Sequence, residues 1–162
     1  MKRIWKVISN FDAEQTEEGA IRLNSDEWKS VEDILDEHLF LRYDGKVCHW
    51  ENGDLMLAIL MIDDDGLKEF KRLDNKMHEG FEGWTKYEDI TEDVLYDRFD
   101  TSIFGFLEND MKFDFFVYRN ENLTKDDVLD KILKFGIDSL TKNDKLVLEG
   151  KEMILPFDLK DD

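Results

Sequence analysis

The sequence is poor in the residues that cross-link or interrupt a fold. It contains one cysteine, Cys48, and one proline, Pro156, among 162 residues. A lone cysteine cannot form an internal disulfide. Proline-rich and low-complexity stretches, which mark linkers between domains, are also missing. Because the length is ordinary for one domain, we predict a single domain spanning residues 1–162.

Long apolar runs are missing as well. The longest, residues 55–62, is far short of the roughly 20 residues that a membrane-spanning helix needs. Residues 1–8 are basic at first, but no apolar segment long enough for a signal peptide follows them. We therefore expect no membrane partner and a cytoplasmic location.

Positive charge is scarce. Lysine and arginine number 22 against 40 aspartates and glutamates, which gives a formal net charge of −18. Such a field repels nucleic-acid phosphates and anionic lipid, so binding to either is disfavoured. The same field attracts a basic protein and speeds its encounter at low salt. The alternative is that the surplus acid only keeps the protein soluble.

Recognisable catalytic and metal-binding motifs are absent, including glycine-rich phosphate loops, Gly-x-Ser-x-Gly and His-Glu-x-x-His. The neighbours Cys48 and His49 lack the second ligand pair of a zinc site. The string at 63–66, Asp-Asp-Asp-Gly, is the most suggestive for a metal. A calcium loop in that register would however place Met61 and Arg72 where carboxylates are needed. We expect no catalytic residues, metal or cofactor, and interpret 63–66 as an acidic turn.

Aromatic residues are plentiful, with 12 Phe, 4 Trp and 4 Tyr, so the chain has the large apolar groups that a folded core requires. Apolar residues three or four positions apart predict helices. These cover residues 26–38 after an N-cap at Ser25, 67–77, a short stretch after Thr91, and 125–135 between Thr124 and Gly136.

Strands are predicted from β-branched, aromatic and alternating patterns. They cover residues 2–9, 20–23, 40–43, 47–50, 55–62, 101–107 and 111–118, with a closing hairpin of 146–148 and 152–157. Residues 55–62 are apolar on both faces, which indicates a central strand. The predicted class is α+β, with a mainly antiparallel sheet and about four helices.

The acid is concentrated in residues 25–38 and 81–100, which together supply ten of the eighteen surplus negative charges. A helix tolerates such crowding either because its face meets a basic partner or because the face is simply solvated. Trp84 lies beside acid and glycine, so it is either an interface anchor or part of the core. The predicted partner-binding residues are Glu32, Asp33, Asp36, Glu37, Glu88, Asp89, Glu92, Asp93 and Trp84.

In size, acidity, α+β character and lack of catalytic motifs, the chain resembles the small acidic immunity proteins that bacteria make against their own polymorphic toxins. Many such toxins are basic nucleases, so the resemblance implies a protein that covers the active cleft of a basic toxin and performs no chemistry. Two alternatives stay open. One is a general adaptor or regulatory domain whose acidity only aids solubility, and the other is a metal-dependent hydrolase.

Overall fold

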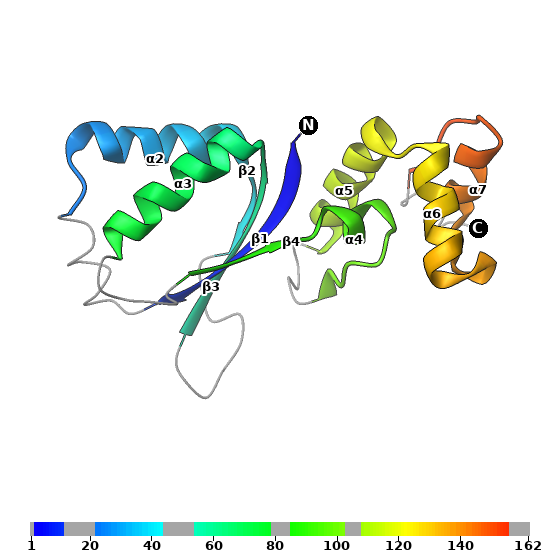
Figure 1. Ribbon diagram of the computed structural model, residues 1–162, viewed down its shortest axis with the longest axis horizontal. Helices are drawn as coiled ribbons and strands as arrows, with labels where there is room; N and C mark the ends of the chain where they lie inside the picture. Colours follow the sequence, from blue (N-terminus) through cyan, green and yellow to red (C-terminus); the bar gives the residue numbers. More distant parts are fainter. Residues whose placement is uncertain (1, 12–21, 44–53, 79–84, 103–107, 156–162) are drawn as a thin grey trace. The chain divides into compact units, whose positions relative to one another are not determined.

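The computed structural model describes residues 2–11, 22–43, 54–78, 85–102 and 108–155. The chain divides into two compact units, Met1–Ile90 and Thr91–Asp162. The first holds a four-stranded antiparallel sheet with two helices, and the second holds helices (Figure 1). The predicted α+β class and antiparallel sheet are therefore confirmed. The described residues contain six α-helices instead of about four.

The sheet of the first unit has the order β2-β3-β1-β4. Its strands are β1 (Arg3–Phe11), β2 (Leu39–Tyr43), β3 (Asp54–Ile62) and β4 (Thr85–Asp89). The prediction that residues 55–62 form a central strand is confirmed, because β3 pairs with both β1 and β2. Ile59 and Leu60, which point to opposite faces of β3, are both fully buried. The predicted strand at 47–50 lies outside the described residues.

Two helices, α2 (Ser25–His38) and α3 (Asp64–Met77), pack side by side over one face of this sheet (Figure 1). Both were predicted from their apolar spacing. Leu67 of α3 packs with Val7 and Leu60 of the sheet. Leu73 of α3 packs with Val31 of α2, which closes the core between the two helices.

The starts of both helices are set by side-chain caps. Asp63 accepts a hydrogen bond of 2.8 Å from the backbone N–H of Gly66, so the 63–66 string is the cap and first turn of α3. A Cβ on Gly66 would lie 2.8 Å from Cγ1 of Ile62, which explains the glycine. The predicted Ser25 cap of α2 is wrong. Asn24 caps this helix instead, because its Oδ1 accepts from the N–H of Glu27 at 2.8 Å.

The second unit contains α4 (Thr91–Leu95), α5 (Glu108–Asn122), α6 (Lys125–Phe135), a 3₁₀ turn (Ile137–Ser139) and α7 (Lys142–Leu148). The predicted bounds of α6 are confirmed. Thr124 and Asp127 form a capping box at its start. Gly136 ends it with φ of 85°, a left-handed angle that favours glycine.

Several predicted strands are not found in the described residues, including 152–155 of the predicted closing hairpin. Residues 111–118 belong to α5, where Met111, Phe115 and Tyr118 are buried at helical spacing. Residues 146–148 belong to α7, which begins with a capping box between Thr141 and Asp144. Residues 22–23 and 101–102, the described parts of two further predicted strands, form no strand either.

A buried ion pair joins α6 to α7. Nζ of Lys131 lies 2.6 Å from Oδ2 of Asp144, and the two residues are only 1% and 2% exposed. Oδ2 of Asp144 also accepts from the backbone N–H of Thr141 at 2.8 Å. One carboxylate therefore both neutralises a buried ammonium group and caps α7. None of the helices in the described ranges combines the length and hydrophobicity needed to cross a membrane.

Candidate functional site

Both units carry an excess of acid. The first unit has 22 acidic and 12 basic residues, and the second has 18 and 10. The predicted acidic segment 25–38 belongs to the first unit. The segment 81–100 is divided, with residues 81–90 in the first unit and 91–100 in the second. The predicted site residues therefore come from both units.

Two of the four predicted carboxylates on α2 are described and exposed. Glu32 and Asp33 lie on the helix away from the buried Val31. Asp33 pairs with Lys29 at 3.0 Å, one turn earlier on the same helix. Asp36 and Glu37 belong to the last turns of α2, and their side chains lie outside the described part of the structure.

The predicted carboxylates of β4 do not share one surface. Asp89 pairs in register with Trp5, whose ring packs on the core beneath α2 and α3, while its neighbour Glu88 points to the other face of the sheet. Asp89 lies 2.6 Å from Nε of Arg3, and Glu88 lies 3.8 Å from Nζ of Lys6. Trp84, the predicted anchor, lies outside the described residues.

Glu92 and Asp93 stand in the first turn of α4, where carboxylates favour the helix dipole. Glu92 pairs with Lys134 of α6. Asp93 is exposed and forms no ion pair with a described residue. In their ion pairs the side chains of Asp33, Glu88 and Glu92 all stay more than half exposed, and surface pairs of this kind contribute only about 0–1 kcal/mol. A basic partner could therefore displace their lysines at little cost.

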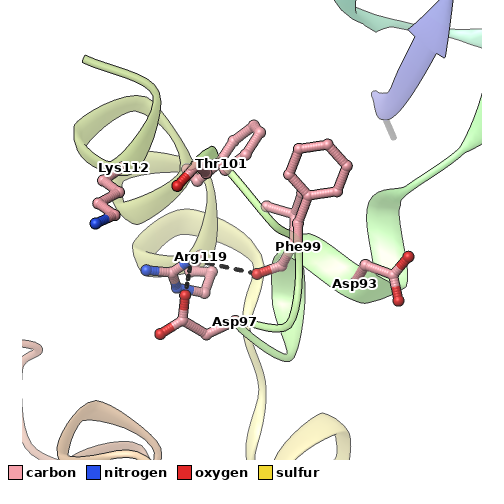
Figure 2. A pocket seen from close by; sticks show the side chains of 8 residues that line it. Asp93, Asp97, Phe99, Thr101, Lys112 and Arg119 are labelled. Carbon is pink, nitrogen blue, oxygen red and sulfur yellow. Dashed lines mark hydrogen bonds and ion pairs between the residues drawn. The ribbon is translucent and has the colours of Figure 1, made fainter. Parts of the chain in front are cut away.

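Asp93 also lies at the rim of a cavity of about 250 Å³ in the second unit (Figure 2). The cavity is formed by α4, the segment that follows it, and α5. Its walls combine acidic, basic and aromatic side chains: Asp93, Val94, Asp97, Phe99, Thr101, Lys112, Phe115 and Arg119.

Arg119 is the most buried charge in this cavity. Its Nη1 lies 3.3 Å from Oδ1 of Asp97 and donates to the carbonyl oxygen of Val94 at 3.3 Å (Figure 2). Burial lowers the pKa of Arg119, while Asp97 and Asp144 oppose that shift. Asp97 has φ of 54°, a left-handed angle uncommon outside glycine. We infer that Arg119 holds the turn after α4 against α5.

The cavity offers one hydroxyl beside a carboxylate, since Oγ1 of Thr101 donates to Oε1 of Glu108 at 3.2 Å. The pKa of Glu108 is lowered, chiefly by a hydrogen bond from Lys112. A general base works best when its pKa lies near the operating pH, so Glu108 is poorly suited to that role. The arrangement instead ties the segment before α5 to its first turn.

Sequence reasoning missed the exposed apolar side chains of the second unit. Phe113 and Val117 on α5 are 43% and 37% exposed, and Leu129 and Leu133 on α6 are 49% and 84% exposed. The apolar pattern predicted a strand at 111–118 and a helix at 125–135, without indicating that these four side chains are exposed. Spacing from aspartates alone would not have identified them, because Leu67 follows Asp64 at the same spacing in α3 and is buried.

No family model matches this chain, and neither a curated protein nor a solved structure matches it.

Proposed function

We propose that this chain is a non-catalytic binding protein that neutralises a basic protein, as an immunity protein does with a toxin such as a nuclease. The observation that supports the proposal is the weak internal pairing of the acidic surface. Asp33 and Lys29, for example, remain 62% and 73% exposed in their side chains although they are in contact. Such carboxylates keep most of their charge available to a partner.

In the proposed mechanism the field of the protein brings the partner to the acidic surface, and close contacts then determine how long it stays. Long-range attraction raises the association rate, most strongly at low salt. A few well-packed aromatic or charged contacts set the dissociation rate. Inhibition follows when the bound protein covers the basic cleft that the partner uses for its own substrate.

The first test measures association kinetics. The tagged full-length chain is used to isolate its partner from the source cells, and association is then followed by stopped flow at several salt concentrations. Reversing Asp33, Asp36 and Glu37 together to lysine is expected to slow association more than about fourfold at low salt. The control reverses Asp138, Glu149 and Glu152, which changes the net charge equally elsewhere.

Equal rates for the triple variant and wild type would remove these α2 residues from the interface. An association rate that does not change with salt concentration would contradict electrostatic docking. It would support an adaptor in which charge only aids solubility. Strong thermal stabilisation by a divalent metal would support a hydrolase instead, because a bound ligand stabilises the folded state.

A further inference from the structure

Two helices of the second unit carry the same pattern of four residues. In this pattern an aspartate is followed three residues later by an apolar residue. The same pair is then repeated four residues further along the helix. The α5 ridge consists of Asp110, Phe113, Asp114 and Val117. The α6 ridge consists of Asp126, Leu129, Asp130 and Leu133.

This spacing places all four residues of each ridge on one side of the helix. Positions three and four apart are neighbours on a helical surface. Seen along the axis, the two apolar residues form an apolar line and the two aspartates form an acidic line beside it. The opposite sides are buried through Phe115 on α5 and Val128 on α6. The ridges therefore lie on the more exposed sides of their helices, although Asp114 is partly buried.

The ridge on α6 reverses the usual arrangement of an amphipathic helix. Leu129 and Leu133 point outward, whereas Lys131 is fully buried against Asp144. Core formation would favour the leucines inside. Exposed apolar residues gathered on one helical face, rather than scattered singly, are typical of an interaction surface.

The aspartates of the ridges have no close ion-pair partner among the described residues, although Asp130 interacts electrostatically with Lys134 one turn later. None of Asp110, Asp114, Asp126 and Asp130 forms an ion pair with a described residue. Both cations of α5 are engaged elsewhere, since Lys112 pairs with Glu108 and Arg119 pairs with Asp97. The α5 ridge therefore combines an apolar line with unpaired negative charge.

We propose that the α5 and α6 ridges each dock a basic amphipathic helix of the partner, with its lysines and arginines against the aspartates and its apolar residues against the apolar line. Helices commonly bind through apolar anchors at positions i, i+3, i+4 and i+7. The inference rests on the proposed function, because it assumes that the partner is basic. It adds a surface that the predicted acidic residues do not include.

Charge complementarity favours a cationic helix over a second copy of this chain as the occupant of the ridges. A second copy of this chain would bring ridge aspartates against other carboxylates of a molecule with the same net charge of −18. Like charges that meet across an interface cost several kcal/mol. A cationic helix meets no such opposition, and its apolar face covers the exposed phenylalanine, valine and leucines.

The test uses a defined probe, a fluorescent 18-residue peptide of leucine and lysine with all leucines on one helical face. A scrambled peptide of equal composition and a leucine–glutamate analogue serve as controls. Fluorescence anisotropy measures their binding to the full-length protein. We expect the leucine–lysine helix to bind at least about tenfold more tightly than either control.

Three double variants then locate the binding surface. Leu129→Ser with Leu133→Ser, and Phe113→Ser with Val117→Ser, are each expected to weaken binding by about fivefold or more. Asp110→Asn with Asp114→Asn is expected to weaken it and to reduce its salt dependence. The matched control is Asp138→Asn with Leu155→Ser, an exposed acidic and apolar pair outside the ridges, which should bind as wild type. Circular dichroism confirms that each variant is folded.

Several outcomes would contradict the proposal that the ridges dock a basic helix. Equal peptide binding by the ridge variants and the control would exclude them, while salt-dependent association of the natural partner would still support the proposed function. A concentration-dependent dimer that Leu129→Ser with Leu133→Ser abolishes would identify a second copy as the occupant. Failure of wild type to bind the peptide would also reject the proposal. Conversely, peptide binding at the ridges with a salt-insensitive natural partner would reject the proposed function alone.

Discussion

At the scale of single residues, the buried pair of Lys131 and Asp144 is the most consequential feature of the second unit. Removing one partner of a buried ion pair leaves an uncompensated charge in the interior. Asp144 has a second role as the cap of α7. Lys131 therefore contacts the same carboxylate that forms the capping box of α7.

We predict that Lys131→Ala lowers the free energy of unfolding by about 3–5 kcal/mol. Lys134→Ala is the matched control, because Lys134 lies on the same helix but pairs with Glu92 at the surface. The control should cost no more than about 1 kcal/mol. Urea denaturation at pH 7 measures both losses in free energy of unfolding. Similar losses for the two variants would show that the buried pair contributes no more to stability than the surface pair.

The sequence did not reveal this pair. The lysines and aspartates of residues 125–135 balance one another, which is the pattern of a solvated helix face. Which lysine is buried depends on how α6 packs against α7, and α7 was itself predicted as a strand. An error in one element therefore concealed a feature of its neighbour.

At the scale of elements, α5 shows why sequence patterns can mislead. Met111, Phe113, Phe115 and Val117 alternate with other residues as in a strand. Apolar residues also fill positions 116 and 118, so the segment fits a helical period equally well. The structure resolves the ambiguity through burial at positions 111, 115 and 118. By contrast α6 was predicted with its bounds, because Thr124 and Gly136 mark its two ends. The helices α2 and α3 were predicted from their apolar spacing, but their caps were not.

The acidic side of α5 carries a cost in stability that depends on pH. Burial raises the pKa of Asp114 above its usual 3.8, and the nearby Asp110 raises it further. The folded state therefore holds this proton more tightly than the unfolded state. Ionising Asp114 lowers stability as pH rises from below 3.8 through its raised pKa. The cost is absent well below pH 3.8 and is complete once the pH exceeds the raised pKa.

We predict that Asp114→Asn raises the free energy of unfolding at pH 7 by a few tenths of a kcal/mol and leaves it unchanged at pH 3. Asp100→Asn should do the opposite at pH 7, because hydrogen bonds from Ser102 lower the pKa of Asp100. Urea denaturation at both pH values tests the pair. A loss of stability in Asp114→Asn at pH 7 would contradict the assigned direction of its pKa shift.

At the scale of the whole molecule, composition predicted the kind of surface but not its layout. Net charge indicates an acidic exterior without giving the placement of any carboxylate. Glu88 and Asp89 illustrate the limit, because strand geometry sends these neighbours to opposite faces. The ridges on α5 and α6 can be identified from the sequence only after both segments are known to be helices.

The prediction of one domain concerns the two units together, and the tryptophans make it testable. All four, Trp5, Trp28, Trp50 and Trp84, lie within Met1–Ile90, whereas most of the helical residues that the structure describes lie in Thr91–Asp162. Tryptophan fluorescence therefore reports on the first unit, while far-ultraviolet circular dichroism is weighted toward the second.

We expect one cooperative transition, because 162 residues is an ordinary size for one domain. The substitution Lys131→Ala lies in the second unit and should lower the urea midpoint equally in both signals. A fluorescence midpoint that stays at the wild-type value while the dichroism midpoint falls would show that the two units unfold independently.

The ridges also affect the tendency of the unbound protein to associate with itself. Outward leucines would make unbound molecules adhere to one another, and the surrounding carboxylates keep those molecules apart by mutual repulsion. That protection is weakest near pH 4.5, where the calculated net charge vanishes. Concentrated stocks should therefore turn cloudy on mild acidification and clear again on neutralisation, and serine at positions 129 and 133 should reduce the turbidity.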